Sequence, residues 1–202
     1  MKIKLIATTL LIGSAFAAMG YGIGEFSKGE HLHGHAESAI HDENVIEVHA
    51  SWMEGSETLA DLVDKSDLVV IGTLDEELGA YQPFDGEDDT FTDAKIHINQ
   101  VLKGDAKDII ISQYGGVRPD GKVEVFHDVP ILKKNKKQLF FLTKIEDSTL
   151  RNGKYQYTNG IEGLFSIDKE TVDSSADTAL TKEMSNRDFQ DIVKEIKTIT
   201  KP

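Results

Sequence analysis

The sequence predicts a mainly β protein in which short strands form a small, closed or nearly closed β-barrel between two amphipathic helices. Three observations lead to this fold class. Apolar or alternating runs of strand length recur over residues 68–167, Gly-containing turns separate them, and helical periodicity flanks them on both sides. A two-sheet β-sandwich is the alternative that the same pattern allows.

The helix before the strands is expected over residues 56–65. Ser56 is a suitable N-cap residue, and an acidic residue follows it in the first turn. The i, i+3 and i+4 spacing of one apolar face is provided by Leu59, Leu62 and Val63.

The strands are predicted from β-branched and aromatic runs, several of which alternate between apolar and polar residues. Two long runs, residues 68–74 and 91–102, are expected to be central strands of the barrel. Shorter strands are expected at residues 108–113, 122–126, 138–145, 155–157 and 164–167. The turns between them contain Gly115-Gly116, Asp120-Gly121, Asn152-Gly153 and Asn159-Gly160.

The closing helix is expected to begin at Ser185, with Asp188 at the capping-box position. A single apolar stripe follows along the predicted helix. It consists of Phe189, Ile192, Val193, Ile196 and Ile199.

Residues 1–24 have the composition of a targeting or anchoring segment. Lys2 and Lys4 precede an apolar stretch, residues 5–24, that carries no charge. This order is typical of an export signal, with a cleavage site after Ala17. The same stretch, as an apolar helix, is also long enough to span a bilayer core of about 30 Å. Both interpretations place the rest of the chain outside the cytoplasm, secreted or anchored to the outer face of the cytoplasmic membrane.

The composition excludes several classes of function. The chain has 202 residues, 35 acidic against 22 basic, and a formal net charge of −13. Phosphate backbones repel such a chain, so we expect no nucleic-acid partner. The absence of cysteine excludes disulfides, Cys-type zinc sites, iron–sulfur clusters and thiol catalysis.

A histidine-rich, acidic segment, residues 25–55, separates the leader from the predicted barrel domain, residues 56–202. His31, His33 and His35 stand at every second position, so an extended chain projects them to one side. With His41 they form a candidate site for zinc, copper or nickel, since neutral imidazole is a common ligand for these ions. The alternative, which the composition favours, is a solvated tether.

A phosphate-binding loop is suggested by one spacing, in which Gly116 is followed five residues later by Gly121-Lys122. The next residue, Val123, replaces the Ser or Thr that holds magnesium, and a strand replaces the required helix. We therefore expect a hairpin turn here.

Other charged groups are expected to be structural. The acidic run at 85–89 is a candidate for loose calcium binding, but its spacing is not that of an EF-hand. The basic run at 133–137 could contact anionic lipid headgroups or cell-wall phosphates, although a turn that protects the next strand from aggregation is the favoured interpretation. His97 and His127 lie in predicted strands without a visible catalytic partner, and no Gly-x-Ser-x-Gly motif is present.

Several motifs resemble those of a family of exported bacterial proteins, Firmicutes-like and of unknown function. In this family a helix, Ser-Asp, a hydrophobic strand and Gly are followed by Val-Leu-Lys-Gly, an Ile-rich strand with Gly-Gly, and Lys-x-x-Leu-Phe-Phe-Leu. The matching segments are residues 59–72, 101–104, 109–116 and 136–142. The layout is also similar to the OB-type barrel of netrin-like modules, which bind proteins at a barrel edge. Their inhibitory members use an N-terminal Cys, which this chain lacks.

We therefore expect an exported or membrane-tethered binding module of the cell envelope that is not an enzyme and has no cofactor. Its partner is expected to be an envelope protein or a wall polymer. The alternative function is extracytoplasmic metal handling by the histidine tract. No catalytic residue is predicted.

Overall fold

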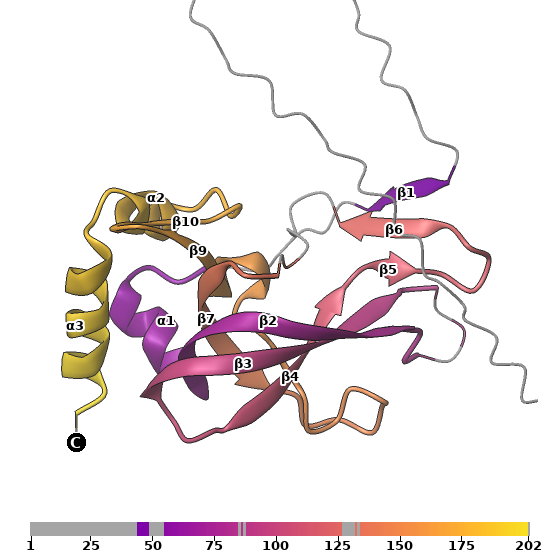
Figure 1. Ribbon diagram of the computed structural model, residues 1–202, viewed down its shortest axis with the longest axis horizontal. Coiled ribbons are helices and arrows are strands. Elements are labelled where there is room, and N and C mark those ends of the chain that lie inside the picture. Colours follow the sequence, from indigo (N-terminus) through magenta and orange to yellow (C-terminus); the bar gives the residue numbers. More distant parts are fainter. Residues whose placement is uncertain are drawn as a thin grey trace, which may run out of the picture. The chain divides into compact units, whose positions relative to one another are not determined.

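The structure is a computed structural model that describes residues 44–48, 55–84, 86, 88–126, 132 and 134–201. Its helical elements are α1 (Leu59–Lys65), the 3-10 helix η1 (Gly160–Gly163), α2 (Ala179–Ser185) and α3 (Phe189–Ile199). Its strands are β1 (Val45–Val48), β2 (Leu68–Tyr81), β3 (Phe91–Lys103), β4 (Asp108–Tyr114), β5 (Gly116–Val117), β6 (Val123–Phe126), β7 (Lys137–Lys144), β8 (Tyr155–Tyr157), β9 (Leu164–Asp168) and β10 (Thr171–Asp173). Figure 1 shows their arrangement.

A five-stranded β-barrel is closed by the pairing order β2–β3–β4–β8–β7–β2. All of these pairs are antiparallel except β4–β8, which is parallel at Ile111 and Tyr155. The strands β2, β3 and β4 form a meander, the next barrel strand β7 returns to pair with β2, and β8 closes the barrel between β7 and β4. This Greek-key order is the topology of a small OB-like barrel. The predicted fold class is therefore confirmed, and the alternative sandwich is not formed.

Two further groups of strands extend the barrel. β9 and β10 continue the sheet outward from β7 as antiparallel strands. β5, β6 and β1 form a separate sheet, in which β5 pairs antiparallel and β1 pairs parallel with β6. β1 lies in the segment that the sequence assigns to a solvated tether, so residues 45–48 of that segment belong to the folded domain.

Barrel strands β2 and β7 are buried on both faces, which explains their continuous apolar runs. Leu68 and Val70 of β2 point into the barrel interior, whereas Val69 and Ile71 face the helices outside it. The same alternation continues on β7. Its inward residues are Phe140 and Leu142, and its outward residues are Leu139 and Phe141.

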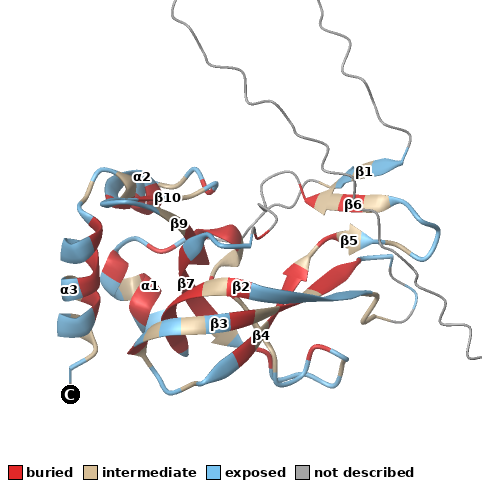
Figure 2. Cartoon of the chain, viewed as in Figure 1, coloured by how far each residue is buried: buried red, intermediate tan, exposed pale blue. Residues whose placement is uncertain are grey.

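The helices α1, α2 and α3 cover the outer face of β2, β7, β9 and β10 with one apolar cluster. α3 contributes Phe189, Ile192, Val193 and Ile196, the stripe expected from its sequence. Figure 2 shows the buried residues of α1 and α3 on their inner faces and the exposed residues of α3 on its outer face. Both amphipathic helices are thus confirmed.

The helix starts differ from the prediction. Thr58, not Ser56, caps α1 by accepting a hydrogen bond from the Asp61 N–H. Ser185 is the last residue of α2, a helix that the sequence did not predict, and α3 is capped by Asp188 itself. The strand over residues 68–74 continues to Tyr81, so the acidic connection begins at residue 82.

Within the part of the chain that the structure describes, no helix combines the length and the apolar character needed to cross a membrane. The predicted leader, residues 1–24, lies outside the described residues. The leader and its two alternative roles therefore stay predictions.

Candidate functional site

A network of polar side chains lies on the outer face of the barrel where β2, β3 and β4 meet the connection between β7 and β8. We call it the β3–β4 network, and it consists of Tyr81, Asp93, Ser112, Arg151, Lys154 and Gln156. Figure 1 shows the connection, residues 145–154, in orange beside β4. OB-fold barrels use this face, together with the connections on either side of it, to bind ligands.

The strand register brings the first members of the network together. Asp93 on β3 is directly opposite Ser112 on β4, and Phe91 is opposite both Tyr114 and Tyr81. Directly opposed residues of an antiparallel pair project from the same face of the sheet. This places the carboxylate and the serine hydroxyl side by side, within reach of Tyr81.

The hydroxyl of Tyr81 joins the two strands. It donates to Asp93 Oδ1 at 2.8 Å and lies 2.7 Å from Ser112 Oγ. Since the Tyr81 proton points at the carboxylate, Ser112 donates to the phenol oxygen. Burial raises the pKa of Tyr81, against the effect of hydrogen bonds from Ser112 and Lys154. The phenol is therefore a hydrogen-bond donor at neutral pH and not a base.

Lys154 reaches the same pair from the end of the connection. Its Nζ lies 2.5 Å from Asp93 Oδ2 and 3.1 Å from the Tyr81 hydroxyl, and also 4.3 Å from the Tyr81 ring centre. The side chains of Lys154 and Asp93 are only 19% and 14% exposed. Burial lowers the pKa of Lys154, but the hydrogen bonds to Asp93 and Tyr81 outweigh it and raise the pKa overall. The ammonium is therefore charged at neutral pH.

Arg151 is the most unusual member of the network, because it is a cation with 5% exposure. Its Nε donates to Ser112 Oγ at 3.1 Å, and its Nη2 donates to Gln156 Oε1 at 2.8 Å. The guanidinium also lies over the Phe91 ring, 4.2 Å from its centre. None of these partners is anionic. Among the described residues, no carboxylate forms an ion pair with this guanidinium.

The network is arranged for hydrogen bonding and not for nucleophilic attack. Ser112 is 1% exposed, and its hydroxyl is engaged by Arg151 and Tyr81. A serine nucleophile needs an adjacent base and access to substrate. His97, on β3 opposite Asp108, is exposed and takes no part in the network.

A second polar cluster holds the β5–β6 hairpin against the barrel. Glu124, 3% exposed, accepts from the Thr90 N–H and hydroxyl at 3.1 and 3.2 Å and from Arg118 Nη1 at 3.1 Å. Arg118 also pairs with Asp88 of the acidic connection at 3.3 Å. Most of these groups have partners within the cluster, which indicates a structural role, although the buried Arg118 Nε has no hydrogen-bond partner among the described residues and lies 3.6 Å from Asp120 Oδ1. The turn from Arg118 to Lys122 closes a hairpin, as the sequence predicts for this glycine-rich spacing.

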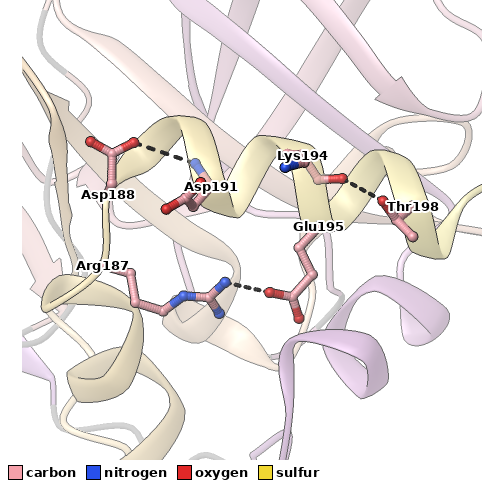
Figure 3. Close-up of a pocket in the computed structure, with 6 residues that line it drawn as sticks. All are labelled: Arg187, Asp188, Asp191, Lys194, Glu195 and Thr198. Atoms are coloured by element: carbon pink, nitrogen blue, oxygen red, sulfur yellow. Dashed lines mark hydrogen bonds and ion pairs between the residues drawn. The ribbon is translucent and has the colours of Figure 1, made fainter.

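A surface hollow of about 470 Å³ lies along the outer face of α3 (Figure 3). Its lining is formed by Arg187, Asp188, Asp191, Lys194, Glu195 and Thr198. Several of its polar groups are already used by α3 and the residues just before it. Arg187 pairs with Glu195, the Asp188 side chain accepts from the Asp191 N–H at 3.3 Å, and the Thr198 hydroxyl donates to the Lys194 carbonyl at 2.9 Å. We therefore assign no ligand to this hollow.

The metal ligands expected from the sequence, His31, His33, His35 and His41, lie outside the described residues. The described residues contain no group of three or more His, Asp or Glu side chains placed to hold a metal ion. His127 also lies outside them. The histidine hypothesis therefore stays a prediction about a segment whose geometry is not described.

Comparison with known proteins assigns the chain to no family, since no protein-family model and no curated protein matches it. The function is therefore argued from the site itself. None of the network residues was predicted from the sequence. Asp93 and Ser112 are two of several polar residues in β3 and β4, and their local pattern does not single them out.

Proposed function

We propose that this protein is an exported, non-enzymatic binding module of the cell envelope that holds its partner on the outer face of β3 and β4. The partner is an envelope protein or a wall polymer. The observation that carries the proposal is the β3–β4 network, in which two cations and one carboxylate lie on the face that OB-fold barrels use for ligands. The choice of this face as the binding face rests on an analogy with other OB-fold barrels. The chemistry proposed for it rests on the side chains of this chain.

The network has the qualities of a preorganised binding surface. All of its side chains except Gln156 take part in two or more hydrogen bonds, so little conformational freedom is lost when a partner binds. Leu150, next to Arg151, is 66% exposed and offers an apolar contact beside the polar groups. Tyrosine and arginine, both present in the network, are enriched among the interface residues that dominate binding energy.

The leader supports the proposed location. Lys2 and Lys4 before the apolar residues 5–24 favour export, with the leader either cleaved or kept as a membrane anchor. The motif order that resembles exported bacterial proteins supports the same location. An extracytoplasmic binding module with a long segment before its barrel can reach partners at some distance from the membrane surface.

Site-specific crosslinking of the full chain in cells tests this proposal. A photoreactive residue at Leu150 is expected to give one discrete crosslinked envelope product, and Lys154→Gln is expected to reduce its yield. The matched control places the same residue at Lys194, exposed on the outer face of α3, and is expected to give no such product. The same products from both positions, or no product from Leu150, would contradict the proposed binding face.

Metal handling is the second candidate, favoured by the alternating His31, His33 and His35 with His41 nearby. Titration of the full chain with zinc or copper at micromolar concentration is expected to show binding that is lost when these histidines are replaced by Asn. His97→Asn, on β3, is the matched control and should leave the binding unchanged. Binding that survives replacement of the tract would exclude this candidate.

A further inference from the structure

We infer that Arg151 and Lys154 form a subsite for a single carboxylate group, which the partner presents to the outer face of β3 and β4. The inference rests on the proposed function, because it names the chemical group that the same face recognises. Three observations carry it: a buried cation without an anionic partner, an ammonium with a donor to spare, and the charge balance of the network.

Arg151 carries a charge that the described residues do not neutralise by contact. It is 5% exposed, and its hydrogen-bond partners are the neutral Ser112 and Gln156. Buried charges in proteins are normally paired, because an isolated ion loses its hydration. Asp147 on the same connection is exposed, and the charge of Arg151 only helps to lower its pKa, after the larger effect of hydrogen bonds from Thr149.

Lys154 provides the accessible donor. Its ammonium has three N–H groups, and the described residues accept two hydrogen bonds from it, at Asp93 and at Tyr81. The side chain keeps 19% of its surface exposed, so the remaining N–H is available to a group from outside. Charge-assisted hydrogen bonds to carboxylates are among the stronger polar contacts in proteins.

The net charge of the network favours a ligand with a single negative charge. Arg151 donates to Ser112, Ser112 to Tyr81 and Tyr81 to Asp93, and Lys154 donates to the same carboxylate. The network therefore contains two cations and one carboxylate. One negative charge from a ligand would neutralise the site. A phosphate monoester carries more charge than this and would be repelled further by a protein whose formal net charge is −13. A monoanionic carboxylate, from a peptide end or a small organic acid, fits both conditions.

Arginine NMR of the full chain tests the subsite, because Arg118, Arg151 and Arg187 are distinguishable reporters. N-acetylalanine imitates a peptide carboxyl end, and N-acetylalaninamide is its neutral counterpart. The acid is expected to shift the Arg151 Nε–H signal saturably with a millimolar Kd, and the amide to leave it unchanged. Arg118 and Arg187 serve as internal controls that should not move.

Variants separate a subsite from a general charge effect. Lys154→Gln is expected to weaken binding of N-acetylalanine about tenfold, since it removes the accessible charged donor. Lys95→Gln removes the same charge from the same face of β3, where its partner is Asp75, and should change the Kd less than about twofold. An equal effect of both variants, or an equal response to acid and amide, would overturn the inference.

Further probes identify the source of the carboxylate. Acetate binding as tight as that of N-acetylalanine supports a small organic acid, and tighter binding of N-acetylalanine supports a peptide end. Tighter binding of inorganic phosphate than of either would overturn the carboxylate assignment. If no probe binds but the Leu150 crosslink still depends on Lys154, the subsite inference fails while the proposed binding face stands.

Discussion

Glu162 shows how a single buried carboxylate can connect segments that are far apart in the sequence. It is 2% exposed and accepts hydrogen bonds from the Ser56 N–H at 2.7 Å, from Asn159 Nδ2 at 3.0 Å and from the Thr178 hydroxyl at 3.0 Å. It thereby ties η1 to the start of α1 and to the N-cap of α2. Buried carboxylates with several charge-assisted hydrogen bonds are costly to truncate, because their donors are left without partners.

Replacement of this carboxylate should therefore be strongly destabilising. Glu162→Ala is expected to lower the free energy of unfolding by about 2–4 kcal/mol. Glu170→Ala, at an exposed position just before β10, is the matched control and should change it by less than about 0.5 kcal/mol. Urea titration of both variants measures the difference. Equal stabilities of the two variants would show that Glu162 does not hold these segments together.

The contacts between individual residues of the β3–β4 network are what the sequence does not predict. Asp93 and Ser112 meet because β3 and β4 pair in one register, and Tyr81 joins them after irregularities in the β2–β3 pairing, the last between Glu77 and Gly79. A bulge changes which residues share a face beyond it, and no local pattern reveals it. Arg151 lies in the connection between β7 and β8, and the path of this connection is determined by the positions of the two strands. The β3–β4 network could therefore not be predicted from periodicity.

At the scale of the elements, the sequence pattern predicted the strands and helices that have long apolar or periodic runs. β3 and α3 were expected from their apolar periodicity, and β2, β4 and β7 from apolar runs of strand length. α2 was missed since it is short, follows a Ser- and Asp-rich segment and buries few apolar residues, chiefly Leu180 and Met184. The start of α3 was misplaced because Ser185 and Asp188 are both good N-cap residues.

The structure separates these two caps, and stability measurements can test the assignment. The Asp188 carboxylate accepts from the Gln190 and Asp191 N–H groups at 2.8 and 3.3 Å, whereas the Ser185 hydroxyl donates to the Thr181 carbonyl. Asp188→Ala is expected to lower the free energy of unfolding by about 1 kcal/mol, and Ser185→Ala by less than about 0.5 kcal/mol. Asp188→Asn, which keeps the capping oxygen, should restore most of the stability. A larger loss of stability from Ser185→Ala than from Asp188→Ala would indicate that Ser185, not Asp188, caps the helix.

At the scale of the whole molecule, one set of strands separates two cores. Alternate residues of β2 and β7 face the barrel interior and the helix-covered outer cluster, so both cores depend on the same backbone. The interior also encloses polar atoms, among them the Tyr157 hydroxyl, which has no hydrogen-bond partner among the described residues. Burial raises the pKa of Tyr157, as it does that of Tyr81.

These groups determine how stability changes in alkaline solution. Lys154 also has a raised pKa, because its hydrogen bonds to Asp93 and Tyr81 outweigh the effect of burial. Above about pH 10 the unfolded chain releases protons from such groups while the folded protein retains them. Stability falls with pH wherever the folded state binds more protons, so the free energy of unfolding is expected to decrease steadily above about pH 10.

Tyr157→Phe isolates one contribution to this decrease. The variant removes a buried hydroxyl without a protein partner, so it is expected to be at least as stable as the natural chain at pH 7. It also removes a proton that the unfolded chain loses first, so its stability should fall less between about pH 9 and 11. Urea titrations of both proteins across this range measure the two slopes. Parallel slopes would mean that Tyr157 is accessible to water in the folded protein, and the closed barrel interior described above would then need revision.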